Sequence, residues 1–156
     1  MTKRILLFNI YLMCLLVLGY SCSTRNSLDD DVIERFQVYF LENNLMTSQD
    51  MIVIYYPPSS CEPCLNATNN LIHYLEKESE DDVLKALVSY PTNKDLLYKP
   101  EAIVYYDANY REFERNGINL SGAFVFLISE YNFIYVKTIN DINLELIKKR
   151  INKFIH

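Results

Sequence analysis

The sequence predicts a single α/β domain in which helices flank a central mixed sheet, completed by a C-terminal antiparallel hairpin and a last helix. Three observations predict this class. The chain has 156 residues, enough for one domain with a single core. Short apolar runs of strand length alternate along it with segments of helical period. Residues 123–128 and 133–138 are apolar runs divided by a short polar turn, which is typical of a hairpin.

The chain starts with the pattern of a secretory signal. Lys3 and Arg4 precede a mostly apolar run over residues 5–18, which is short for a membrane-spanning helix. Small residues and then Cys22 follow, so we expect a lipoprotein signal in which Cys22 is acylated and becomes the mature N-terminus. Plain secretion and an uncleaved anchor are the alternatives. The predicted organisation is a signal peptide, a tether and a domain: residues 1–21, 22–28 and 29–156.

The lipoprotein hypothesis also predicts a location. Several acyl chains on one cysteine anchor a protein stably, whereas a single chain is marginal. We therefore expect a protein of the bacterial cell envelope, anchored to a membrane by lipid on Cys22 and facing the periplasm or the exterior.

The domain is predicted to begin with a helix and a buried strand. From Asp29, apolar residues recur at helical spacing as far as Phe40. Residues 51–56 are a continuous apolar run that ends at Pro57, as expected of a buried strand. A second helix follows the prolines and ends near Glu78. One face of it carries five residues: Cys64, Thr68, Leu71, Ile72 and Leu75.

Shorter elements follow an acidic loop over residues 78–82. We predict strands at 83–90 and 101–107, with a loop or short helix between them. A brief helix over residues 109–116 should end near Gly117. After the hairpin, a last helix is predicted to start at Asp141, with an apolar stripe at Leu144, Ile147, Ile151 and Phe154. The predicted core contains Val53, Ile54, Leu71, Leu75, Val104, Phe124, Phe126, Val136, Ile147 and Ile151.

Charge limits the classes of partner. The net charge is -5, and no basic stripe is present to neutralise a phosphate backbone, so we expect no nucleic-acid partner. The one dense basic cluster, residues 148–150, lies on the predicted amphipathic last helix and is interpreted as a solvated face.

The cysteines point to redox chemistry. If Cys14 leaves with the signal and Cys22 carries lipid, only Cys61 and Cys64 remain as thiols. A structural disulfide framework needs more pairs than this. Cys61 falls where the buried strand gives way to a helix, and free N–H groups at a helix start favour a thiolate there. Pro63 suits the first helical turn, where a missing N–H costs nothing. Cys64, one turn later, can resolve a mixed disulfide formed by Cys61.

Other interpretations of the same residues stay open. The two thiols could be half of a metal site, although they supply only half of a tetrahedral shell. They could also be an idle pair. Glu62 could accept a proton from Cys64, or its charge could raise the pKa of Cys61 and make the pair more reducing. Of Tyr55 and Tyr56, we expect one in the core and the other at the rim of the site.

The motif Cys61-Glu62-Pro63-Cys64, the strand before it and the segment 121–128 resemble the thioredoxin superfamily, in particular the membrane-tethered thiol-disulfide oxidoreductases of the TlpA and ResA type. The resemblance covers roughly residues 30–156. It implies a thioredoxin-like fold, with Cys61 as nucleophile, Cys64 as resolving thiol, and Glu62 and Pro63 tuning the thiolate. It also implies protein thiol or disulfide substrates, a membrane electron donor or acceptor, and no cofactor or metal besides the redox-active disulfide.

Two positions depart from the family pattern. Ser60 stands immediately before the motif, where the family usually has an aromatic residue, often Trp. Gly122, preceded by Ser121, stands where the family has a cis-proline that faces the dithiol, and residues 101–156 contain no proline. By the same resemblance, Ser60, Ser121 and Gly122 are the expected substrate-binding positions. The alternative function is a non-enzymatic binding lipoprotein with a weak or idle redox pair.

Overall fold

The computed structural model describes residues 28–78, 82–93, 95–118 and 120–156. The predicted signal peptide, Cys22 and all of the tether except Leu28 lie outside these ranges, and the acidic loop is described only at Glu78 and Asp82. No helix within the described ranges is both long enough and apolar enough to cross a membrane.

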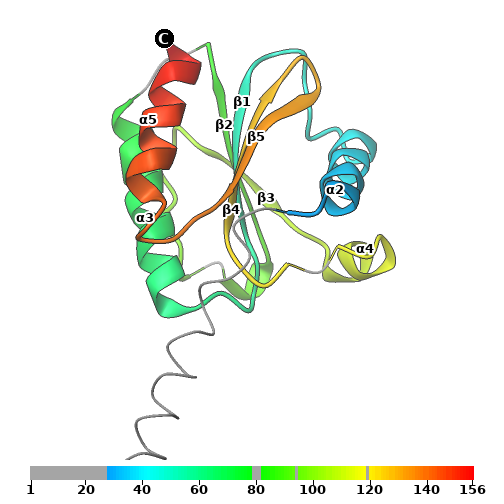
Figure 1. Cartoon of the computed structure of the whole chain (residues 1–156). Helices are drawn as coiled ribbons and strands as arrows, with labels where there is room; N and C mark the ends of the chain where they lie inside the picture. Colours follow the sequence, from blue (N-terminus) through cyan, green and yellow to red (C-terminus); the bar gives the residue numbers. More distant parts are fainter. Residues whose placement is uncertain (1–27, 79–81, 94, 119) are drawn as a thin grey trace, which may run out of the picture.

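The fold is built on a five-stranded mixed sheet in the order β3-β2-β1-β4-β5 (Figure 1). Its strands are β1 (Met51–Tyr56), β2 (Leu84–Ser89), β3 (Val104–Asp107), β4 (Phe124–Ser129) and β5 (Asn132–Thr138). The first three run parallel to one another, whereas β4 is antiparallel to both of its neighbours. β1 is the central strand, and it is buried along its whole length, as the sequence predicts.

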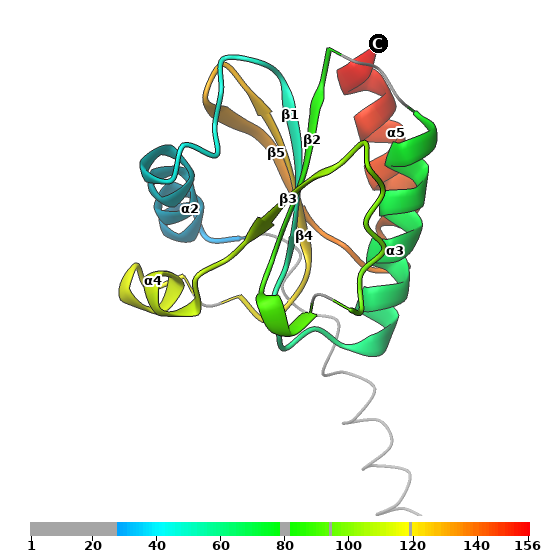
Figure 2. The same ribbon diagram turned by 180° about the vertical axis from the view of Figure 1, so that it is seen from behind.

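Helices cover both faces of this sheet, which makes three layers. α3 (Glu62–Lys77) and α5 (Leu144–Ile155) pack on one face, and α2 (Asp30–Glu42) and α4 (Tyr110–Arg115) lie on the other (Figures 1 and 2). A single 3-10 turn, η1 (Pro91–Asn93), follows β2. The order of helices and strands is the predicted one, with this turn at the position where we expected a loop or short helix.

The alternation of side chains along β1 explains why all six of its residues are apolar. Ile52, Ile54 and Tyr56 join the core beneath α3 and α5. Met51, Val53 and Tyr55 join the aromatic core beneath α2 and α4. Successive side chains of a strand point to opposite faces, and here both faces are covered by helices.

Two element boundaries and one core residue differ from the prediction. Strand β3 starts at Val104 instead of residue 101, and the Val104 side chain is 42% exposed rather than part of the core, because β3 is a short edge strand. The last helix starts at Leu144, after a turn over residues 141–143. Phe154 of the predicted stripe is half-buried and packs against the core, and Ile155 adds a buried residue at the end of the helix. The other predicted core residues are buried, except that Val136 is half-buried.

Two of the chain reversals in the described residues depend on left-handed backbone at the following positions. At the end of α4, Gly117 has φ of 65°, and the N–H of Ile118 donates to the carbonyl of Phe113, which is the expected glycine stop. The hairpin between β4 and β5 turns on Glu130 and Tyr131, with φ of 48° and 64°. A two-residue turn with positive φ at both positions matches the twist of the paired strands, and glycine, asparagine and aspartate are its usual residues.

Candidate active site

The dithiol lies where the central strand passes into a helix. β1 ends at Tyr56, and a short loop leads to Cys61, which is the N-cap residue of α3. The backbone of Cys61 is extended, with φ of -76° and ψ of 160°, and its carbonyl accepts the N–H of Leu65 as the first bond of the helix. Cys61 therefore lies beside the unpaired N–H groups of a helix start, where a negative charge is stabilised.

The two thiols face each other across the first turn of α3. The Sγ atoms of Cys61 and Cys64 are 2.6 Å apart, in a contact in which either thiol can donate. A disulfide requires about 2.05 Å, so only a small displacement separates this contact from a bond. Cys64 is 7% exposed, and Cys61 is half-buried. The outer sulfur is thus the one that solvent and a partner reach more easily.

The neighbours of the cysteines in α3 shape the start of the helix. Pro63 occupies the first helical turn, as predicted, and Glu62 is exposed beside it. Thr68, buried one turn after Cys64, donates its hydroxyl to the Cys64 carbonyl at 2.7 Å. This face of α3 packs onto the sheet. The backbone at Cys64 is therefore held by that packing and by the hydrogen bond from Thr68.

The Tyr56 side chain and the Oγ atom of Ser60 are buried along the segment that leads from β1 to Cys61. Tyr56 is 2% exposed, and Tyr55 is 1% exposed, so both tyrosines are buried and the prediction that one lies at the rim is wrong. Burial raises the pKa of the Tyr56 phenol, the nearby Ser60 hydroxyl lowers it by less, and the charges of Cys64 and Cys61 raise it further. The Ser60 Oγ is buried and makes no hydrogen bond of normal geometry with another described residue.

Ser121 and Gly122 lie at the same end of the central strands as the dithiol. Tyr55 pairs with Phe124 in the antiparallel register, so the residues just before β4 lie beside the loop that leads to Cys61. Ser121 is exposed and Gly122 half-buried. The described part of the chain contains no cis peptide bond, and Gly122 does not use the left-handed region. A Cβ at Gly122 would make only ordinary contacts, 3.6 Å to Thr138 Cγ2 and 3.9 Å to a Phe124 ring carbon.

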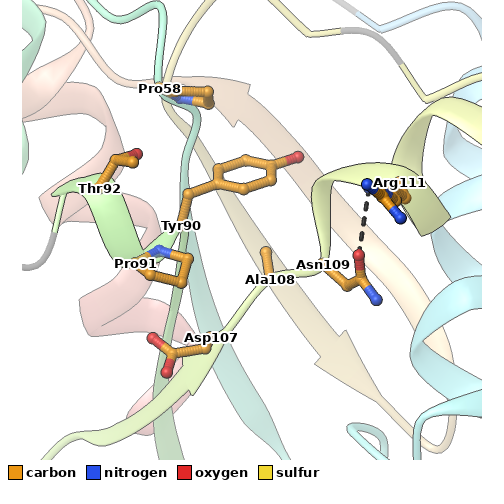
Figure 3. Close-up of a pocket in the computed structure, with 8 residues that line it drawn as sticks. All are labelled: Pro58, Tyr90, Pro91, Thr92, Asp107, Ala108, Asn109 and Arg111. Atoms are coloured by element: carbon orange, nitrogen blue, oxygen red, sulfur yellow. Dashed lines mark hydrogen bonds between the residues drawn. The ribbon is translucent and has the colours of Figure 1, made fainter.

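An open, mostly apolar groove of about 710 Å³ lies next to the dithiol loop, at the carboxyl ends of β2 and β3 (Figure 3). Pro58 lines it three residues before Cys61, so at most about 11 Å of extended chain separates the groove from that cysteine. Asp107 and Arg111 place exposed charges at its rim. Its lining residues are Pro58, Tyr90, Pro91, Thr92, Asp107, Ala108, Asn109 and Arg111.

The sequence analysis did not predict two features of this end of the sheet, the groove and the position of Tyr56. The groove is assembled from three separate loops, and no pattern within any one of them marks it. The position of Tyr56 could have been predicted, because strand alternation places it on the same face as Ile52 and Ile54, and that face also receives the helix bearing Cys64.

No family model matches the chain, and no curated protein matches its sequence. Solved structures do match its fold. DsbF of MTB, solved in its mixed oxidized and reduced forms, aligns with a TM-score of 0.52 and 9% identity over 71% of this chain and 84% of that one. StoA from Bacillus subtilis aligns with a TM-score of 0.47 and 20% identity over 67% and 83%. The thioredoxin domain of a thiol-disulfide oxidoreductase from Bacteroides vulgatus aligns with a TM-score of 0.48 and 13% identity over 72% and 84%.

At these identities the similarity concerns the fold alone. The assignment of the fold rests on the alignment with DsbF, whose TM-score is 0.52. That alignment spans most of the described domain, whose sheet has helices on both faces and ends in a hairpin and a helix. The chain has a thioredoxin-like fold.

Proposed function

We propose that this protein exchanges disulfides with thiols of other proteins, using Cys61 as the nucleophile and Cys64 as the resolving thiol. The observation that carries the proposal is the 2.6 Å approach of the two Sγ atoms at the start of α3, beside the end of the central strand. The alternative is a binding lipoprotein of the same fold whose redox pair is weak or idle.

The reaction follows from the different exposure of the two thiols. The Cys61 thiolate attacks a substrate disulfide, and the first substrate sulfur leaves as a thiolate that takes a proton. The Cys64 thiolate then attacks Cys61 Sγ, the bond from Cys61 to the second substrate sulfur breaks, and that sulfur leaves in turn. Two electrons and two protons pass from the dithiol to the substrate, and the Cys61–Cys64 disulfide remains. The reverse sequence oxidises a substrate dithiol.

The groove beside the dithiol favours a polypeptide as the substrate. Its volume lies in the range of ligand pockets, its lining is mostly apolar, and it is open along one side rather than enclosed. An extended segment with an apolar side chain fits such a surface. Because the groove begins within about 11 Å of Cys61, that side chain belongs about three residues from the reacting substrate cysteine. Ser60, Ser121 and Gly122 at the same edge are the proposed contacts for the backbone of the substrate.

The test of this proposal is a redox titration of the full-length protein in glutathione buffers. We expect a reversible two-electron transition between the dithiol and a Cys61–Cys64 disulfide, located by peptide mapping. Failure to form that disulfide under mild oxidants would leave the binding lipoprotein as the better description.

We also propose that lipid on Cys22 holds the domain at a membrane of the bacterial cell envelope, where a membrane partner supplies or removes electrons. The basic start, the apolar run and Cys22 support this proposal. Cys22→Ser is expected to move the protein from the membrane fraction to the soluble fraction. Mass spectrometry should find a diacylated or triacylated Cys22 at the mature N-terminus, and an unmodified Cys22 there contradicts the anchor.

Gly122 is proposed to stand where related proteins hold a cis-proline. A proline would fix a backbone that glycine leaves free, and a Cβ fits at this position. Gly122→Pro is therefore expected to increase turnover with a protein disulfide such as insulin, with Gly122→Ala as the control for the added Cβ. A well-folded proline variant with unchanged turnover would show that Gly122 is not the equivalent position.

A further inference from the structure

The last helix buries one side against the sheet and exposes the opposite side. Its buried residues are Leu144, Ile147, Ile151 and Ile155. Leu146, Lys149 and Lys153 are exposed, and their spacing of three and four residues places them together on the side of α5 that faces away from the core. Ile142, in the turn that leads into the helix, is exposed as well. We call Ile142, Leu146, Lys149 and Lys153 the outer stripe.

The outer stripe contains the two most exposed large apolar side chains among the described residues. Ile142 is 83% exposed and Leu146 is 55% exposed. Single apolar residues are normal on a protein surface, and a helix side that only contacts water has no need of them. Apolar side chains beside lysines are typical of surfaces that lie at a membrane interface. There the apolar groups enter the lipid, and the long lysine stems leave their charge among the headgroups.

Basic residues are concentrated on this helix, although the chain as a whole is acidic. Four of the 15 basic residues lie within α5, which contains one acidic residue, while the net charge of the chain is -5. Lys148 forms an ion pair with that acidic residue, Glu145, at 2.9 Å. Lys149 and Lys153 form no ion pair with another described residue. The positive charge of the outer stripe is therefore complementary to an anionic partner.

The outer stripe starts at the end of the sheet where the dithiol lies. The N–H of Ile139 donates to the carbonyl of Ala123 at 2.8 Å, directly before β4, so the chain leaves β5 at that end. α5 then runs beside α3 and in the same direction (Figure 1). The Tyr74 hydroxyl, late in α3, accordingly donates to the side-chain oxygen of Asn152, late in α5. Because α3 begins at Cys61, the first turn of α5 is the part nearest to the dithiol end.

We propose that the outer stripe docks on a bilayer containing anionic phospholipids, with its two aliphatic side chains in the interface and its two lysines against the phosphates. The inference goes beyond the proposed exchange reaction and does not depend on it. Docking would turn the dithiol end of the sheet toward the membrane. Two lysines and two aliphatic side chains bind weakly and reversibly, so this contact orients the domain and adds to lipid on Cys22 without replacing it.

A fluorescent label on the outer stripe tests this contact. Leu146→Cys is labelled with the environment-sensitive fluorophore NBD in the full-length chain. The four natural cysteines are replaced there by Cys14→Ser, Cys22→Ser, Cys61→Ser and Cys64→Ser. The label reports contact at its own position, whatever residues 1–21 contribute to binding. On vesicles of phosphatidylcholine with about 30% phosphatidylglycerol, we expect a blue shift, about threefold brighter emission and quenching by nitroxide-labelled lipids. Vesicles of phosphatidylcholine alone, or about 1 M salt, should give no response.

Charge reversal separates the outer stripe from the charge of the whole chain. Lys149→Glu/Lys153→Glu should weaken the affinity for anionic vesicles at least about 25-fold, because each lysine at such a surface contributes about fivefold. Lys77→Glu/Arg115→Glu makes the same change in net charge at exposed residues of α3 and α4 and should have less than about a threefold effect. The same label at Val38→Cys, exposed on α2 across the sheet, should stay in water. Thermal unfolding checks that each variant folds.

Four results would overturn the inference. They are a silent label at Leu146→Cys on anionic vesicles, an equal response on phosphatidylcholine alone, an equal response at Val38→Cys, and an equal loss in both charge-reversal variants. A response without vesicles that grows with protein concentration would assign the outer stripe to a second copy of the chain and also overturn it. Failure of the exchange reaction would leave these results unchanged, because the labelled chain has no dithiol.

Discussion

Cys61→Ser is expected to abolish disulfide exchange, whereas Cys64→Ser is expected to trap mixed disulfides with substrate proteins. The reason is the position of each sulfur. Cys61 is half-buried at the helix N-terminus and can be reached by a substrate, while Cys64 is 7% exposed and faces the sheet. Without Cys61 no mixed disulfide forms. Without Cys64 the mixed disulfide forms but has no internal thiol to resolve it.

The two variants should be examined in cell-envelope fractions on non-reducing gels, with Cys61→Ser/Cys64→Ser as the control. Only Cys64→Ser should give higher bands that collapse on reduction. Alkylation of the wild-type protein tests the same assignment, because iodoacetamide should modify Cys61 before Cys64. Modification of Cys64 first, or trapped complexes with Cys61→Ser, would reverse the roles of the two cysteines.

The largest expected effect on stability is at Phe36. This residue of α2 is fully buried, and its ring lies 5.1 Å from the ring of Phe126, 5.2 Å from Tyr55 and 5.5 Å from Phe113, measured between centroids. It thus joins two helices to the central part of the sheet. Phe36→Ala would leave a cavity there and lose the aromatic contacts, so we expect the free energy of unfolding to fall by about 3–5 kcal/mol.

Urea unfolding followed by far-UV circular dichroism measures this effect, and Val38→Ala on the same helix is the matched control. Val38 is 45% exposed, and alanine favours helix more than valine, so its change should stay within about 0.5 kcal/mol. Since small domains are stable by only about 5–15 kcal/mol, Phe36→Ala removes a large share of the total. A change of similar size in both variants would mean that α2 does not pack on the sheet as described.

The central part of the fold could be predicted from local patterns. Residues 51–56 are apolar at every position because helices cover both faces of β1. A six-residue apolar run that is followed by two prolines is typical of a buried strand. The period of α3 placed Cys64, Thr68 and Leu71 on one face, and all three are buried. These signals are strong because they repeat within a few residues.

Elements at the edges of the fold were less predictable. Val104 is an apolar, β-branched residue of the kind found in core strands, yet its side chain is exposed because β3 is at the edge of the sheet. The hairpin turn at Glu130 and Tyr131 lacks the usual glycine or asparagine, so its two left-handed residues are imposed by the pairing of β4 with β5. In both cases a neighbour in space decides what the local sequence leaves open.

The sequence by itself determined the α/β class, the central strand and the position of the two thiols at a helix start, because each depends on residues that are close together in the chain. Tertiary structure decided what surrounds those thiols. The loop before β4 with Gly122, and the parts of the groove that follow β2 and β3, lie at the dithiol end of β1 because of an order of strands in the sheet that no local pattern contains. The physical reason is that helix and strand periods are set by bonded geometry and local burial, whereas a site at a sheet edge is set by which strands become neighbours.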